Sequence, residues 1–163
     1  MSTAEPARPK RVVASVQDML DLIGEPMGPS EWHVITQDHI DRFADAVGNP
    51  AANHTDPEWA ARTPMGVTIA FGSQVLAMTT LLLGDLWELM GVVGGADCGS
   101  NRVRHLEPVP VNSTVRLRAT IASAEPVDES GVRVVTDLEF EKDGGTRPVC
   151  VAQVVNLFWF TPD

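Results

Sequence analysis

The sequence predicts a single α+β domain in which an antiparallel β-sheet curls around one apolar helix. Residues 63–90 contain a long apolar run with hardly a charge, and four strand-like segments follow it up to Phe160. Turn-forming residues separate these segments. A helix that is apolar on nearly every side must be buried on most of them, and sequential strands joined by short turns favour an antiparallel sheet.

The expected central helix begins near Gly72. From there apolar residues recur at spacings of three and four, which predicts a helix as far as Met90. Gln74, Gly84 and Asp85 leave the uncharged run shorter than a membrane-spanning helix requires. We therefore expect a buried helix, at whose start unpaired N–H groups favour an oxygen that carries negative charge.

Length and composition indicate one compact domain over residues 16–163, preceded by a loose arm at residues 1–15 that is rich in Pro, Ala and Arg. The net charge of −10 disfavours nucleic acids and anionic membranes as partners. The N-terminus lacks the apolar stretch of a signal peptide, so we expect a cytoplasmic protein. Cys98 and Cys150 have no metal-binding spacing and are expected to be reduced core residues.

Capping residues and turn residues predict the remaining elements. Thr36 is expected to cap a helix that ends at Gly48, and Asp56 to cap another that begins at Pro57, with a polar loop between them. A short helix is expected at 16–23 and a short strand at 32–35. Residues 91–99 read as a glycine-rich bend, and the four strands are expected at 100–106, 114–124, 131–142 and 149–160.

The last predicted strand, 149–160, is apolar on both faces over much of its length. The central helix can cover only one of these faces. We therefore expect a partner subunit on the other face or at a sheet edge, in a dimer.

Among the histidines, His54 differs in its surroundings. It lies in the polar loop near Asn49 and Asn53 and shortly before Gly72. The residues alone fit a solvated loop histidine better than a catalytic one. The other three lie in or beside predicted elements and are interpreted as structural or surface residues: His33, His39 and His105.

Arginines alternate along two of the expected strands, so each pair lies on one face of the sheet. The first pair is Arg102 and Arg104, and the second is Arg116 and Arg118. Such a strip suits either phosphate groups or a solvated face, and the residues do not decide between these.

Four stretches together resemble the MaoC-like hydratase family, which includes the (R)-specific enoyl-CoA hydratases and the nodulation protein N-like dehydratases. They are IDRFADAVGN at 40–49, HTDPE at 54–58, TIAFG at 68–72 and RVRHLEPVPV at 102–111. The resemblance covers residues 36–160. It implies a hot-dog fold, an antiparallel sheet wrapped around a central apolar helix.

The resemblance also implies a catalytic site. In this family an aspartate and a histidine act on one water, and a backbone N–H after a second histidine holds the thioester carbonyl. The matching positions here are Asn49, His54 and Gly72, so asparagine replaces the aspartate and Phe71 replaces the second histidine. Asn49 can orient a water but cannot take its proton. Phe71 and Ser73 flank Gly72 and are expected to contact substrate, as are Arg102 and Arg104.

The implied activity is that of a lyase, a hydratase or dehydratase that adds water across the C2=C3 bond of 2-enoyl thioesters. Coenzyme A enters as part of the substrate, and the chemistry requires no metal or separate cofactor. Asn49 keeps open a non-catalytic acyl-CoA-binding subunit that pairs with an active homologue. A hot-dog thioesterase is less favoured, because no carboxylate lies between Thr63 and Gly84.

Overall fold

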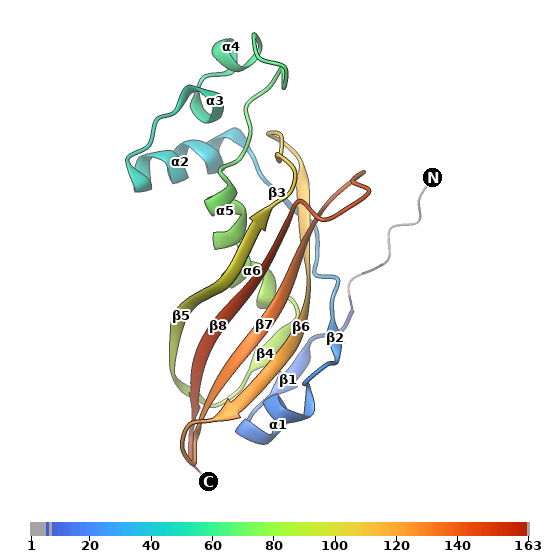
Figure 1. The fold of residues 1–163 in the computed structure, drawn as a ribbon, viewed down its shortest axis with the longest axis vertical. Coiled ribbons are helices and arrows are strands. Elements are labelled where there is room, and N and C mark those ends of the chain that lie inside the picture. The colour runs from blue at the N-terminus through green and yellow to red at the C-terminus, as the bar shows by residue number, and fades with distance from the viewer. Residues whose placement is uncertain (1–5, 7, 163) are drawn as a thin grey trace.

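The computed structural model describes residue 6 and residues 8–162. A curved antiparallel sheet with the strand order β2-β6-β7-β8-β5 forms its body, and β3 also pairs with β6 (Figure 1). The strands are β2 Pro26–Met27, β3 His33–Val34, β5 Val92–His105, β6 Thr114–Pro126, β7 Gly131–Lys142 and β8 Cys150–Phe160. The four long strands are therefore confirmed.

The expected bend at residues 91–99 is wrong, because these residues form the first half of β5. The strand pairs with β8 from Val92 onward, with register shifts at three places along it. Gly99 has a φ of 103° at one of them. Bulges of this kind bend a strand without ending it, which explains why glycines here do not mark a turn.

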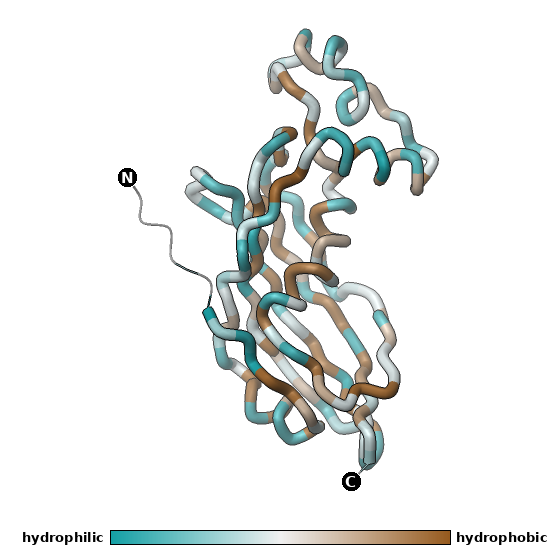
Figure 2. The backbone as a smooth tube through the Cα atoms, turned by 180° about the vertical axis from the view of Figure 1, so that it is seen from behind, coloured by the Kyte–Doolittle hydropathy of each residue, from teal (hydrophilic) through white to brown (hydrophobic). Residues whose placement is uncertain are grey.

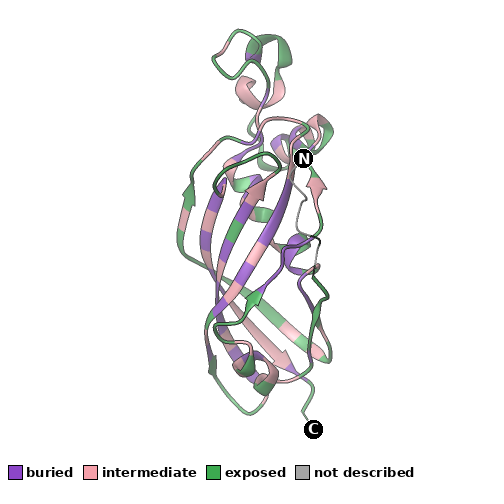
Figure 3. Ribbon diagram, turned by 90° about the vertical axis from the view of Figure 1, so that its right-hand side faces the viewer, coloured by how far each residue is buried: buried purple, intermediate pink, exposed green. Residues whose placement is uncertain are grey.

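Side chains alternate between the two sides of the sheet, and one side carries the core. Hydrophobic and hydrophilic residues alternate along the strands in Figure 2, and buried residues concentrate in the central strands in Figure 3. Leu117 on β6 lies opposite Phe140 on β7, and Leu138 lies opposite Ala152 on β8, all four of them buried.

Two short helices, α5 Gly72–Ala77 and α6 Thr79–Leu83, run along the core side of this sheet (Figure 1). The prediction of one helix reaching Met90 is wrong. After Gly84 the chain turns into β4 Trp87–Leu89, which pairs in parallel with β1 Arg11–Val13. An apolar spacing this short fits a helix as well as a strand. The pairing with β1 therefore decides that Trp87–Leu89 forms a strand.

The central helices are also less enclosed than expected. Val75, Leu82 and Leu83 are buried, but the opposite side of α5 and α6 is exposed, including Ala77 and Leu81, the latter 53% exposed. No helix of the described residues is long and apolar enough to cross a membrane.

The expected loose arm is wrong for its last residues. Arg11–Val13 forms β1, and Val13 is fully buried. Ser15 then caps α1 Val16–Asp21 by accepting a hydrogen bond from the backbone N–H of Asp18. Residues 1–5 and 7 lie outside the described residues.

Three helices lie beyond the end of the sheet at which α5 begins (Figure 1). The first is α2 Gln37–Val47, capped by Thr36 and ended by Gly48 with a φ of 66°, as expected. Asp56 caps α4 Pro57–Ala60, also as expected. The polar loop between them contains an additional short helix, α3 Ala52–Thr55, which carries His54.

Candidate functional site

His54 is half-buried, and both of its ring nitrogens have hydrogen-bond partners. Its Nδ1 lies 2.7 Å from the carbonyl oxygen of Ile69. A carbonyl oxygen only accepts hydrogen bonds, so the neutral ring carries its proton on Nδ1. Nε2 is then the basic nitrogen, and it lies 3.0 Å from the amide nitrogen Nδ2 of Asn53.

The ring of His54 also stacks on the ring of Phe71, with 3.7 Å between the centroids and 23° between the planes. Phe71 is the last residue before α5 and is 6% exposed. The histidine is therefore held by a hydrogen bond in the plane of its ring and by an aromatic contact above it.

Hydrogen bonds of the backbone and of side chains hold α3 against the residues that precede α5. The N–H of Ile69 donates to the carbonyl of Asn53 at 3.2 Å. The side-chain amide of Gln37 on α2 donates to the backbone carbonyl of His54 at 2.8 Å, and the Thr68 hydroxyl donates to the side-chain oxygen Oε1 of Gln37. On the other side, the N–H of Ala70 donates to the carbonyl of Val109 at 2.8 Å. His54 is thus fixed relative to the chain that follows β5.

A cavity of about 250 Å³ lies beside this histidine. His54, Gly72, His105, Glu107 and Cys150 are among the residues that line it. The structure therefore brings together the predicted base and the predicted glycine. It also adds His105, which the sequence led us to treat as structural.

Gly72 is the first residue of α5, and Phe71 supplies no side-chain cap, so the Gly72 N–H has no partner within the helix. The ring of His105 lies against it: a Cβ at residue 72 would be 3.0 Å from the ring atoms Cγ, Cδ2 and Cε1. A larger side chain at residue 72 would therefore fit only if the exposed His105 ring shifted by a few tenths of an ångström.

Cys150 lines the same cavity and is buried. Burial raises the pKa of its thiol to about 11, so the thiol keeps its proton at neutral pH. Cys98 differs from our expectation, since it is exposed on β5. The bulged half of that strand lies at the sheet edge and leaves it uncovered.

Ser73 lies on a neighbouring side of α5 and lines a second cavity of about 410 Å³. Leu76 and Ala77 from the helix, with Trp87 and Phe158 from β4 and β8, also line it. Ser73 is therefore adjacent to the candidate site in sequence but faces a different hollow.

Asn49 makes no direct hydrogen bond to the His54 ring among the described residues. It is exposed in the loop after α2, and its backbone N–H donates to the carbonyl of Ala44 at 2.9 Å. The asparagine that contacts the basic nitrogen is Asn53 instead. The family resemblance points to Asn49, and the structure adds Asn53, which lies next to His54 in the short helix α3.

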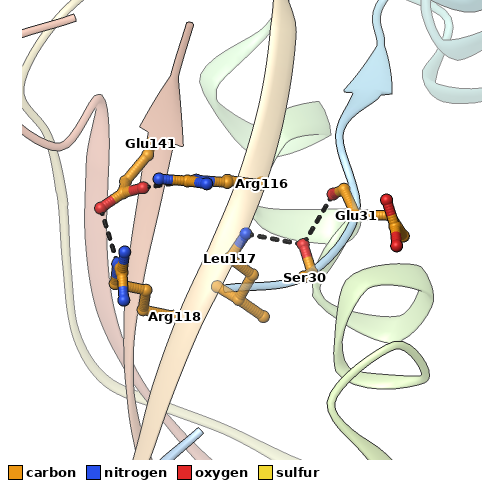
Figure 4. A network of polar contacts seen from close by, with 6 residues as sticks. All are labelled: Ser30, Glu31, Arg116, Leu117, Arg118 and Glu141. Carbon is orange, nitrogen blue, oxygen red and sulfur yellow. Dashed lines mark hydrogen bonds and ion pairs between the residues drawn. The ribbon is translucent and has the colours of Figure 1, made fainter. Parts of the chain in front are cut away.

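The arginines lie on the side of the sheet that faces away from the core, and acidic residues of β7 neutralise most of them. Arg102 pairs with Asp137 at 3.1 Å. Arg116 and Arg118 both donate to Glu141, at 2.7 and 2.9 Å (Figure 4). Arg104 is exposed and donates to the carbonyl of Val103. The strip is therefore less basic than the sequence indicated, and it is separate from the His54 cavity.

Comparison with known proteins agrees with this architecture. Residues 18–142 match the MaoC like domain. The chain is 37% identical over 145 residues to 3-hydroxyacyl-thioester dehydratase Z of Mycobacterium tuberculosis, an alignment that covers 89% of this chain and 96% of that protein. It is 30% identical over 151 residues to nodulation protein N of Rhizobium leguminosarum, covering 91% and 94%.

Two solved structures show the same fold. A monoamine oxidase regulatory protein from an Archaeoglobus species superposes with a TM-score of 0.75 at 26% identity, covering 95% of this chain and all of that one. A 3R-hydroxyacyl-ACP dehydratase complex, HadBC of Mycobacterium tuberculosis, superposes with a TM-score of 0.66 at 18% identity, covering 84% and 97%. The sheet that wraps α5 and α6 is a hot-dog fold, and the chain belongs to the MaoC-like dehydratase domain family.

Proposed function

We propose that the protein is a hydratase or dehydratase of acyl thioesters, which adds water to a 2-enoyl thioester or removes it from a 3-hydroxyacyl thioester. The observation that carries the proposal is the state of His54. Its Nδ1 proton is held by the Ile69 carbonyl, so Nε2 is a proton acceptor at a cavity that Gly72 also lines. The name of the mycobacterial relative points to the same reaction.

In the hydration direction, Nε2 of His54 takes a proton from water while the water oxygen bonds to C3 of the substrate. The C2=C3 electrons move toward the thioester oxygen, which accepts a hydrogen bond from the Gly72 N–H. C2 then takes a proton, so that H and OH have added across the double bond. Asn53 donates to Nε2 in the free protein, and the incoming water replaces that contact. The role proposed for Asn49 is to orient this water.

The acyl chain is proposed to lie in the cavity of about 410 Å³ along α5 and α6. Ser73, which follows Gly72 in α5, lines this cavity. Trp87 and Phe158 also line it and meet edge to face, with 5.9 Å between the ring centroids. The apolar part of this lining suits an acyl chain. The other lining residues are polar, namely Ser73, Thr79, Thr80, Asp97, Ser100 and Asn156. The phosphates of coenzyme A are proposed to meet Arg102 and Arg104, which precede His105 on β5.

The proposed assembly is a dimer with a second copy or with a homologous subunit. Among the described residues β5 pairs only with β8, and its fourteen residues are mostly exposed. A long open strand edge favours pairing with another chain. HadBC is a complex that contains a chain of this fold.

A non-catalytic acyl-CoA-binding subunit is the second candidate, and the exposed Asn49 in place of the family aspartate favours it. Incubation with crotonyl-CoA and longer 2-enoyl-CoAs, followed as loss of enoyl absorbance, separates the two. Turnover that disappears in His54→Ala supports the enzyme. Binding of the thioester without turnover supports the second candidate.

A further inference from the structure

The cavity beside His54 contains a second imidazole. The three ring atoms of His105 that lie 3.0 Å from a Cβ position at residue 72 indicate that the ring covers the Gly72 backbone with its face. His105 is the last residue of β5, and it lines the same cavity of about 250 Å³ as His54. The two histidines therefore flank the glycine whose N–H is proposed to hold the thioester oxygen.

Among the groups of this cavity that can transfer a proton, His105 is the one left available besides His54. Glu107 forms an ion pair with Arg147 at 2.6 Å. The Cys150 thiol is buried and has a pKa of about 11. No hydrogen bond to a ring nitrogen of His105 occurs within the described part of the chain, and its side chain is exposed.

A second proton-transfer group suits this reaction. Hydration removes one proton from water and delivers another to C2, and positioned side chains accelerate such transfers. Asn49 cannot take or give a proton. C2 is bonded directly to the thioester carbonyl carbon, so a substrate whose oxygen is held at Gly72 has its C2 close to the ring of His105.

Resting on the proposed function, we propose that His105 is a second catalytic residue, which delivers the proton to C2 while His54 takes the proton of the water. In hydration His105 starts as the imidazolium and ends neutral, and His54 starts neutral and ends as the imidazolium. Each returns to its starting state by exchanging one proton with solvent. In dehydration the same residues act in reverse, so His105 removes the C2 proton and His54 protonates the leaving hydroxyl.

The variant His105→Phe tests this, because it keeps an aromatic ring over Gly72 and removes both nitrogens. We expect kcat for crotonyl-CoA hydration to fall by about 10²- to 10⁴-fold, with little change in KM or melting temperature. His105→Gln serves as a second variant should the phenylalanine disturb the fold. His39→Gln is the matched control, because it removes an exposed imidazole outside the cavity and glutamine still suits the third position of α2.

A kinetic isotope effect distinguishes proton transfer from packing. With 3-hydroxybutyryl-CoA deuterated at C2, loss of His105 makes cleavage at C2 slower, so the isotope effect on dehydration is expected to rise above the wild-type value. A His105→Phe protein with wild-type kcat, or with reduced kcat and an unchanged isotope effect, overturns the assignment and leaves the hydratase proposal intact. A wild-type protein inactive on every thioester overturns both.

Discussion

The imidazole of His54 lies on the ring of Phe71, with 3.7 Å between the centroids. Phe71 in turn contacts Phe43 of α2, at 5.3 Å between ring centroids. Because the Ile69 carbonyl fixes Nδ1 at the same time, the stack and the hydrogen bond together determine both the tilt of the imidazole and its tautomer. Phe71, the residue before Gly72, thus holds the proposed base in place although it cannot act on a proton itself.

Phe71→Leu is expected to keep the fold and lower activity. Leucine fills much of the buried volume but removes the stack, whose aromatic contribution is about 1 kcal/mol. We expect kcat for enoyl-CoA hydration to fall about tenfold, equivalent to about 1.4 kcal/mol. Phe43→Leu is the control, since it loosens the same cluster and leaves the His54 contact intact. Equal losses in the two variants would contradict a positioning role for the stack.

Asn49→Asp is expected to raise kcat/KM about tenfold, or about 1.4 kcal/mol of transition-state stabilisation. The change is nearly isosteric and supplies a carboxylate where the family has one. His54→Ala should abolish activity in both backgrounds. Asn53→Asp is the matched comparison, because it puts the carboxylate at Nε2 itself.

A gain confined to Asn53→Asp would show that α3, and not the family spacing, decides which asparagine meets the water. A wild-type protein already as fast as family members with aspartate would show that catalysis is not decided at Asn49.

Local signals were sufficient for much of the fold. Thr36, Gly48 and Asp56 are capping residues whose effect acts within one helical turn, and each lies where we expected it. The four long strands follow from alternation and turns in the same way. Trp87–Leu89 was assigned wrongly because its structure depends on β1, a partner more than seventy residues away.

The site shows the same division. His54 and Gly72, which the family resemblance proposes for the site, line one cavity, but no local pattern shows that His105 covers Gly72. Alternation places His105 and Arg104 on opposite sides of β5 and says nothing of which helix crosses there. The pairing of Arg102 with Asp137 likewise depends on the order of strands in the sheet.

Gly72 and His105 are expected to be coupled in stability. Gly72→Ala forces a Cβ to within 3.0 Å of the imidazole, and overpacking of this kind typically costs about 1–3 kcal/mol. In a His105→Ala background the same change should cost less, and a double-mutant cycle from denaturant unfolding measures the difference. Additive effects would mean that the two residues do not touch in solution.

Gly72→Val extends this test to the ligand. We expect weaker binding of acyl-CoA, because a branched side chain blocks the N–H that is proposed to hold the thioester oxygen. The dissociation constant is measured beside the melting temperature, so that loss of fold and loss of site are separated. Unchanged affinity removes Gly72 from the site.

The two cysteines should react very differently with iodoacetamide. Cys98 is exposed, whereas Cys150 is buried and its pKa is raised to about 11. At pH 8 we expect mass spectrometry to find label on Cys98 and none on Cys150 until the protein is unfolded. Burial favours the neutral thiol, so the contribution of Cys150 to stability is present below the ordinary thiol pKa and is lost as pH rises toward 11. Comparable labelling of both cysteines in the folded protein would contradict this burial.

The open edge of β5 and the uncovered side of α6 are expected to form a subunit interface. Val93 on β5 is 68% exposed and Leu81 on α6 is 53% exposed, which is unfavourable for large apolar side chains unless another chain covers them. Sedimentation at micromolar concentration should show a dimer, and Val93→Lys or Leu81→Lys should shift it toward the monomer, since charges disfavour edge pairing.

Val127→Lys, in the exposed turn after β6, is the control. A wild-type monomer that gains activity only when a homologous chain is added would replace the homodimer with a heterodimer, and a monomer that is active alone would remove the interface.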